Sequence, residues 1–315
     1  MAQPANTFAT NDQIGRREDL SESIWMVSPS DTPGYSQMSK TKATGTEHEW
    51  QTDSLRASGN NAKVEGSDVQ AAAAQPTVRR KNITQLSDDS VRVSSRAQKV
   101  RTAGRSNELT YQKEVKKGVE LRNDIETVLF LNKPKVEGDD STAPELAGIP
   151  AWIKTNTDFG TGGTDPTVAD GSDARNDGTQ RLLRENQVKL VLQEAWNAGG
   201  KPDCFFVGGF NRQLFSSFME GRTPMQKVTD KTMHATYDRY DSDFGQVKVV
   251  PDRFMRARDG LLLQMNMWKV AVLQDFHSFD LAKTGHSDGW VIAYEYTLES
   301  CNEEASAGVF DLKTS

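Results

Sequence analysis

The chain has 315 residues, of which 36% are hydrophobic and 26% are charged, and its formal net charge is −6. This acidic balance argues against sequence-reading nucleic-acid binding, because such proteins are normally basic. The N-terminal sequence lacks the apolar core of a signal peptide, and no segment approaches the 18 apolar residues of a membrane span. We therefore expect a cytoplasmically synthesised protein without a membrane, in which some extended segments find burial only against other copies.

Residues 1–40 are predicted to form an extended arm. Prolines and polar residues dominate it, and only a short helical segment carries apolar anchors, among them Leu20 and Trp25. Large side chains such as Trp25 and Tyr35 gain nothing in a free tail, so docking on a neighbouring subunit is favoured over the alternative of a frayed terminus.

Residues 41–85 are predicted to form a long β-hairpin. The sequence alternates strictly over 43–55, with Trp50 on one face and acids and amides on the other, and the return strand carries Arg79 and Lys81. Opposite charges across such a pair contribute about 0.2–1 kcal/mol each. A two-stranded ribbon is marginal alone, so it should lie on another surface. Between the strands lies a small, polar segment that includes Lys63.

Residues 105–131 are predicted to form one long amphipathic helix, capped by Ser106 and ended by Asn132 and Pro134. About 26 helical residues would span roughly 39 Å. The helix is either an ordinary core helix or a spine that braces extended arms. Gly118 lies in its middle at a cost of about 0.5–1 kcal/mol relative to Ala, which a close approach by another backbone would explain. The predicted buried face consists of Leu109, Gln112, Val115, Val119, Arg122, Ile125 and Leu129.

The rest of the chain mixes helices and strands, which indicates an α+β protein. Residues 133–140 and the Gly- and Asp-rich segment 155–178 are predicted loops, and 146–153 is a compact apolar segment. Helices are predicted at 179–196 and, capped by Asn211, at 211–219. Strands are predicted at 90–94, 202–209, 246–251, 261–265, 269–273, 290–299 and 308–312.

No catalytic constellation is present in the sequence. The 155–178 segment lacks the spacing of a calcium loop and of a phosphate-binding loop, so we interpret it as a surface loop. His277 could form an acid–base pair with Asp275, although a solvent-facing pair at a strand end is the simpler interpretation. Cys204 and Cys301 are expected to be buried free thiols. We expect no catalytic residue, no cofactor and no metal ligand. The alternative is an enzyme or a monomeric binding module that uses the 155–178 loop.

The chain also contains phrases such as RKNITQ, AGRSNELTYQKEVKKGVELRNDIETVL, GGKPDCFFVGGFNRQLFSSF and YEYTLESCNEEASAGVFDL. These phrases and the order of the predicted elements resemble the major capsid proteins of tailed bacteriophages with the Hong Kong 97-type capsid fold. Within that group they resemble a subgroup often labelled a family of unknown function. The resemblance runs from about residue 4 to residue 315.

The resemblance implies a division of the chain into six parts. These are an N-terminal arm at 1–40, an extended loop at 41–85, a peripheral domain at 86–140 with the spine helix at 105–131, an axial domain at 141–250, peripheral-domain strands at 251–300 and a return to the axial domain at 301–315.

The resemblance also implies a structural protein that self-assembles through pentamers and hexamers into the icosahedral head shell of the virion, assembled in the host bacterial cytoplasm. The expected partners are other copies of the chain, a portal, a decoration protein and packaged double-stranded DNA, contacted non-specifically on the inner face. A separate scaffolding protein is expected, because the arm starts within a few residues of Met1. Some members crosslink a loop lysine, but no partner for Lys63 is identifiable. The expected assembly contacts are Leu20, Trp25, Tyr35, Trp50, Lys63, Arg79, Lys81 and Gly118.

Overall fold

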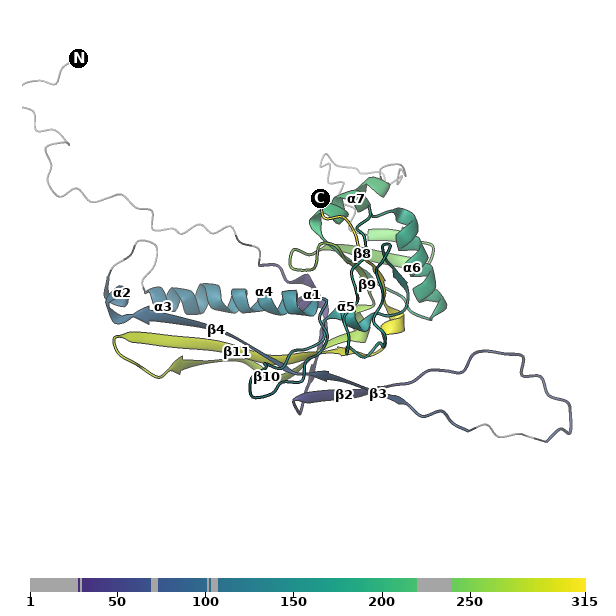
Figure 1. The fold of residues 1–315 in the computed structure, drawn as a ribbon, viewed down its shortest axis with the longest axis horizontal. Coiled ribbons are helices and arrows are strands. Elements are labelled where there is room, and N and C mark those ends of the chain that lie inside the picture. The colour runs from purple at the N-terminus through teal and green to yellow at the C-terminus, as the bar shows by residue number, and fades with distance from the viewer. Residues whose placement is uncertain (1–27, 29, 69–72, 101, 103–106, 220–238) are drawn as a thin grey trace, which may run out of the picture.

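The structure is a computed structural model that describes residues 28, 30–68, 73–100, 102, 107–219 and 239–315. It confirms the α+β class. The described strands form a four-stranded sheet, a six-stranded sheet and a separate two-stranded ribbon. The four-stranded sheet and a long helical rod make an elongated part, and the six-stranded sheet forms a more compact part beside it (Figure 1). None of the described helices is long and apolar enough to cross a bilayer.

The helical rod is made of α3 (Glu108–Tyr111), the π-helix η2 (Gln112–Lys117) and α4 (Gly118–Leu129). It confirms the predicted long helix over 108–129. Its N-cap is Asn107, whose side chain accepts a hydrogen bond from the backbone N–H of Leu109 at 2.9 Å; the predicted cap, Ser106, lies outside the described residues. We call these three helices together the spine.

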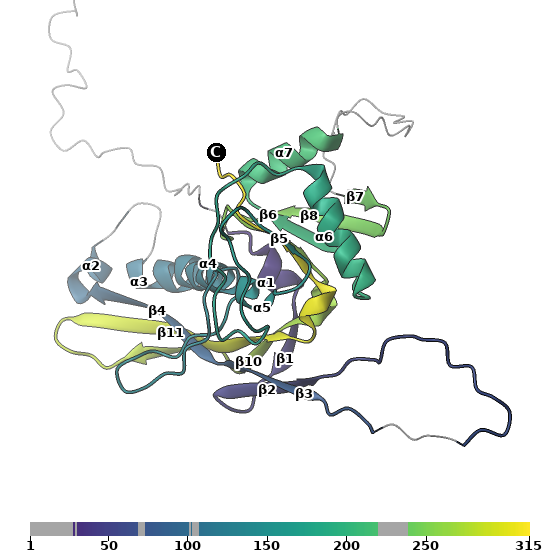
Figure 2. The same ribbon diagram turned by 45° about the vertical axis from the view of Figure 1, so that its right-hand side comes forward.

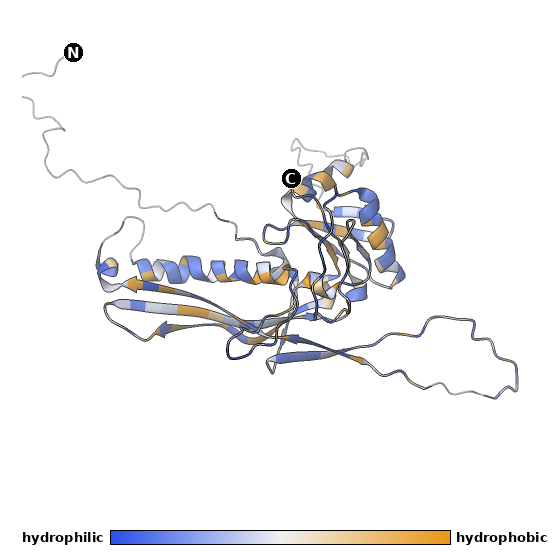
Figure 3. Ribbon diagram, in the orientation of Figure 1, coloured by the Kyte–Doolittle hydropathy of each residue, from blue (hydrophilic) through white to orange (hydrophobic). Residues whose placement is uncertain are grey.

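The predicted buried face of the spine is confirmed at Ile125 and Leu129 and wrong at Val115 and Arg122. The structure buries Leu121, Ile125 and Leu129, which are spaced by four residues, whereas Val115 is 42% exposed and Arg122 is also exposed. The π-helical turn before α4 has a different number of residues per turn, so it breaks the register on which the prediction relied. Figure 3 shows a mainly hydrophilic spine with apolar residues gathered toward its C-terminal end.

The four-stranded sheet has the order β1-β10-β11-β4. Its long members are β4 (Gln85–Ser94), β10 (Trp268–Leu281) and β11 (Ser287–Ser300), paired antiparallel, and the short β1 (Ser39–Lys42) lies parallel to β10. The strands predicted at 90–94, 269–273 and 290–299 are confirmed but extend further. The outer half of β10 is mostly exposed and polar, so it gave no hydrophobic signal.

The six-stranded sheet has the order β5-β12-β9-β6-β8-β7. Its strands are β5 (Thr157–Asp158), β6 (Cys204–Val207), β7 (Arg239–Ser242), β8 (Gly245–Pro251), β9 (Gly260–Leu263) and β12 (Ala307–Val309). The C-terminal strand β12 thus lies in the same sheet as β6 and β8. The predicted strand 261–265 joins this sheet as β9, paired with β6 and β12, rather than the sheet of β10 and β11.

Two helices, α6 (Glu185–Asn197) and α7 (Gly209–Met219), accompany this sheet (Figure 2). The start predicted for α6, residue 179, is wrong: Arg181 forms a parallel bridge with Leu312, which holds the preceding residues extended. The cap predicted at Asn211 is also wrong. That residue lies inside α7, fully buried, and its side chain donates to the backbone oxygen of Ala257 at 3.0 Å.

The remaining described elements are short. They are α1 (Pro33–Gln37), α2 (Ser95–Lys99), α5 (Ile149–Trp152), the 3₁₀ helices η3 (Met265–Met267) and η4 (Glu303–Ala305), and the ribbon strands β2 (Glu47–Thr52) and β3 (Val78–Ile83). A large apolar core joins the C-terminal end of the spine, α5 and both sheets around Trp152 and Trp268. A second core lies between α6, α7 and the six-stranded sheet.

Candidate assembly surfaces

The ribbon of β2 and β3 projects from the body and ends in an exposed loop (Figure 1). The two strands pair antiparallel from Glu47 with Ile83 to Thr52 with Val78, which confirms the predicted hairpin. Between them, every described residue of 53–77 is exposed; Leu55 is 99% exposed and Val64 is 80% exposed. We call residues 53–77 the ribbon tip. It contains Lys63, and its described side chains are exposed to solvent.

Opposite charges face each other across the ribbon, as predicted. Lys81 Nζ lies 3.2 Å from Glu47 Oε2 and 3.0 Å from Glu137 Oε1, and Arg79 Nη1 lies 3.5 Å from Glu49 Oε2. Hydrogen bonds to Glu137 and then to Glu47 raise the pKa of Lys81. These pairs are solvent-exposed, so each contributes little to stability. They fix the pairing of the strands and leave the tip unsupported.

The inner face of the ribbon is anchored on its own chain. Trp50 Nε1 donates to the backbone oxygen of Ser300 at 2.7 Å, and its ring centroid lies 5.3 Å from that of Trp152. His48 Nε2 lies 3.1 Å from Glu299 Oε2. This contact is the largest of the causes that lower the pKa of Glu299 to about 2. Trp50 was predicted as an assembly contact; the structure places its contacts within the chain, because a half-buried indole here finds both an apolar partner and an acceptor.

Asn82 is a second anchor, and sequence reasoning missed it. Its side chain is fully buried, Nδ2 donates to Leu298 O at 2.8 Å, and Oδ1 accepts from the backbone N–H of Ala147 and of Ile83, both at 3.0 Å. A buried amide with three good hydrogen bonds fixes the strand in one register. The only signal in the sequence was a polar residue at the end of a basic strand. We call residues 47–52 and 78–83, with these anchors, the ribbon root.

The last part of the predicted arm also docks on its own chain. Tyr35 in α1 is 5% exposed, and its hydroxyl donates to the hydroxyl of Tyr294 at 3.1 Å. This phenol therefore has a buried apolar site and a polar partner within its own fold, and its contact with a neighbouring subunit stays a prediction. The other two arm contacts, Leu20 and Trp25, lie outside the described residues.

Gly118 marks the junction of η2 and α4. A Cβ atom built there would meet nothing within 4 Å. Crowding within the chain therefore does not explain this glycine, and the approach of another copy stays a prediction.

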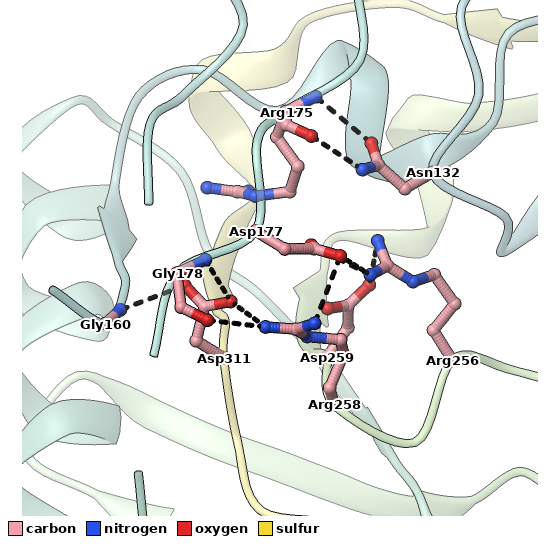
Figure 4. Close-up of polar contacts among 9 residues, drawn as sticks. All are labelled: Asn132, Gly160, Arg175, Asp177, Gly178, Arg256, Arg258, Asp259 and Asp311. Carbon is pink, nitrogen blue, oxygen red and sulfur yellow. Dashed lines mark hydrogen bonds and ion pairs between the residues drawn. The ribbon is translucent and has the colours of Figure 1, made fainter. Parts of the chain in front are cut away.

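A cluster of Arg and Asp side chains joins the C-terminal segment to the neighbouring loops (Figure 4). Asp311 accepts hydrogen bonds from the backbone N–H of Gly160 at 3.0 Å and of Gly178 at 2.8 Å, and its Oδ1 lies 2.6 Å from Arg258 Nη2. Asp311 is almost fully buried. It therefore ties three segments that lie far apart in the sequence, a role no local pattern predicted.

The same cluster continues to the loop before β9. Asp177 Oδ2 lies 2.6 Å from Arg256 Nη2 and 3.1 Å from Arg258 Nη1. Asp259, 1% exposed, lies beside Arg256, and burial raises the pKa of its carboxyl to about 6. Alternating charges of this kind hold the loops in one arrangement.

Arg175 shows that the 155–178 segment is not a simple surface loop. Its side chain is buried, stacks over the Phe310 ring at 3.1 Å, and pairs with Asp165 Oδ1 at 2.6 Å. Asn132 fixes its backbone from the end of the spine, as Figure 4 shows, with hydrogen bonds of 2.8 and 3.1 Å. Half of this predicted surface loop is a structural connector.

The features that could have supported an enzyme are separated or occupied. His277 Nδ1 lies 3.0 Å from the backbone oxygen of Asp275, whose carboxylate instead accepts from the N–H of Phe276. Over the described ranges, no group of three or more His, Cys, Asp or Glu side chains could hold a metal ion. Both cysteines are free thiols; Cys204 is buried as expected, whereas Cys301 is only half-buried.

The projecting ribbon, the long spine and the two separate sheets together define the layout of the chain. Solved structures share this layout. The capsid of a native GTA particle matches with a TM-score of 0.61 and 11% identity, covering 96% of this chain and 98% of that one. A chain from Mycobacterium phage Bobi matches with a TM-score of 0.60 and 10% identity, covering 94% and 95%. These likenesses establish the fold, which is the Hong Kong 97-type capsid fold expected from the sequence.

The sequence places the chain more narrowly. The family described as SU10 major capsid protein matches residues 3–313, so the chain belongs to that family. It is 28% identical over 346 residues to the major capsid protein of Escherichia phage Phieco32, covering 98% of each sequence. The chain is thus a phage major capsid protein, a structural component of the virion shell and not an enzyme.

Proposed function

We propose that this chain assembles through pentamers and hexamers into an icosahedral head shell around double-stranded DNA, and that the ribbon tip of one copy lies on a neighbouring copy. The observation that carries the second part is the contrast within the ribbon. Its root is fixed by Trp50 and Asn82, while every described residue of 53–77 is exposed. The fixed ribbon root sets the direction in which the tip projects. A neighbouring copy then buries the side chains that the tip cannot bury on its own chain.

The six-part division follows the sheets with two changes. In this proposal the four-stranded sheet with the spine is the peripheral domain, and the six-stranded sheet with α6 and α7 is the axial domain. β9 moves to the axial domain, and residues 33–42 join the fold of their own subunit. Only the part of the arm before residue 33 is then available to cross to a neighbour, where Leu20 and Trp25 would contact it.

The proposal includes further partners that the family resemblance implies. They are a separate scaffolding protein, a portal, a decoration protein and the packaged DNA. The net charge of −6 supports a DNA contact that is non-specific and weak. Assembly would take place in the host bacterial cytoplasm.

The test is negative-stain electron microscopy of the full chain after expression, compared with a variant in which residues 57–68 are replaced by a short Gly-Ser linker. We expect the parent to form polyhedral shells, tubes or capsomer rings. The variant should melt at the parent's temperature, since residues 57–68 are all exposed, yet fail to close shells. A parent that stays monomeric with its expected partners present would overturn the proposed assembly. A variant that forms shells at the parent's yield would remove the tip from it.

A further inference from the structure

Glu126 of α4 is a fully buried carboxyl group that holds the end of the arm. Its Oε1 accepts from the backbone N–H of Gly34 at 2.6 Å, and its Oε2 accepts from that of Tyr35 at 2.7 Å. These are the first N–H groups of α1, whose own N-cap, Thr32, makes no side-chain capping bond. Glu126 therefore substitutes for the cap from 92 residues away. Both views place α1 at the C-terminal end of α4 (Figure 2).

A second buried carboxyl group meets Glu126. Asp252 follows β8 and is 2% exposed. Its Oδ1 accepts from the N–H of Phe254 at 2.8 Å, while its Oδ2 is buried with no donor among the described residues. The side chains of Asp252 and Glu126 are within hydrogen-bonding reach of each other. Two carboxyl groups can form such a bond only when one of them carries a proton, and two buried like charges repel strongly otherwise.

The surroundings supply no compensating cation. Across the described ranges, no Lys, Arg or His forms an ion pair with either carboxyl group. The neighbouring elements also carry Tyr35 on α1 and Tyr294 on β11, whose hydroxyls bond to each other. Lys40 on β1 lies over the Tyr35 ring at 4.7 Å, and Arg253, next to Asp252, is exposed. On α4, the nearby Asp124 is another acid. The C-terminal end of a helix also disfavours negative charge.

We propose that Glu126 and Asp252 share one proton, and that this shared proton makes a pH-sensitive latch between α1 and the spine. With the proton present, the pair carries one negative charge and Glu126 can accept both backbone N–H groups. Loss of the proton leaves two buried carboxylates in contact, and the least costly relief is to separate α1 from Glu126 so that water can enter.

The direction of the pH effect follows from the shift. Burial, together with repulsion from Asp252, raises the pKa of Glu126 from 4.5 to about 8. The docked state therefore binds more protons than the undocked state between these two values. Docking is strongest below about pH 4.5 and weakens as the pH rises toward about 8, by as much as tenfold for each pH unit. Above that value the dependence ends.

The test is amide hydrogen exchange of the full chain, read by mass spectrometry on the peptide 33–42 and expressed as protection factors, which removes the intrinsic pH dependence of exchange. For the parent we expect protection to fall at least about tenfold between about pH 6 and about pH 9. Asp252→Asn should move the midpoint of this fall to lower pH, because it removes the repulsion from Asp252 and gives Glu126 an amide donor, while burial still raises the pKa of Glu126. Constant protection in the parent, or an unchanged midpoint in Asp252→Asn, would overturn the proposal.

Two controls keep the result specific. Glu126→Gln should give weaker but pH-independent protection of the peptide 33–42, since an amide nitrogen cannot accept from a backbone N–H. This variant tests the proposal if Asp252→Asn does not fold. Glu120→Gln, an exposed change on the same helix, should keep the parent's fall. The buried strand 204–207 should keep its protection throughout. A parallel fall there, or loss of the effect in Glu120→Gln, would show global unfolding rather than a latch.

Discussion

The root and the tip of the ribbon differ in what their side chains can reach. At the root, Trp50, His48 and Asn82 each find a partner on β11. At the tip, small and polar residues extend into solvent, and the few apolar ones, such as Leu55, touch nothing. The large side chains of the ribbon root therefore dock on their own subunit. The segments left for a neighbour are those that cannot bury enough area alone.

The largest change in the free energy of unfolding should come from removing the aromatic partner on which the ribbon root docks. Trp152 is 1% exposed and stacks on Trp50. Trp152→Ala should lower the free energy of unfolding by about 3–5 kcal/mol, because a large aromatic group is removed from a packed core. The matched control is Leu55→Ala at the tip, which should change it by less than about 0.5 kcal/mol. Denaturant unfolding of the unassembled protein measures both, and similar losses would erase the contrast between root and tip.

A smaller effect is expected where α1 docks. Gly34 lies against the Phe130 ring and Glu126, and a Cβ atom there would clash with both. Gly34→Ala should therefore cost about 1–3 kcal/mol by overpacking. Chemical unfolding, with Gly59→Ala in the ribbon tip as the control with open space, checks the value. A neutral Gly34→Ala would mean that α1 is not seated on the spine.

The smallest effect has the opposite sign. Gly118 has a helical φ of −67° and open space around it. Gly118→Ala should raise the free energy of unfolding by about 0.5–1 kcal/mol, since Ala loses less entropy in a helix. If another copy approaches Gly118, the same variant will be more stable as a subunit yet give fewer shells. Unfolding curves and particle counts on one preparation separate these two effects. A destabilised subunit would contradict the observation that a Cβ atom at Gly118 has open space around it.

What the sequence could predict was local or periodic. The alternation of His48 and Trp50 with Glu47 and Glu49 marked β2 and both of its faces, because a strand repeats every two residues. The spine was visible for the same reason, at the helical period. Its buried face was predictable only toward its C-terminal end, at Ile125 and Leu129, since the π-helical turn before α4 changes the register without a signal in composition.

The rest depends on contacts between distant parts of the chain. Glu126 reaches Gly34 across 92 residues, and Asp311 reaches Gly160 across 151. A buried acid that caps another segment looks, in the sequence, like any charged residue on a helix or in a tail. Tyr35 and Trp50 were correctly singled out as side chains that need burial, but their partners lie on β11 and α5, and pattern alone cannot tell one's own chain from a neighbour's.

We expect the ribbon tip to be free in the unassembled subunit and covered by a neighbouring copy in the shell. Arg56 and Lys63 provide two trypsin sites in the tip, and both are exposed. Limited trypsin digestion of unassembled protein and of closed particles, with fragment masses read by mass spectrometry, tests it directly. We predict early cleavage at Arg56 or Lys63 in the unassembled protein and strong protection in particles. Equal cleavage rates in the two forms would contradict the account, because they would mean that the tip does not lie on a neighbouring copy.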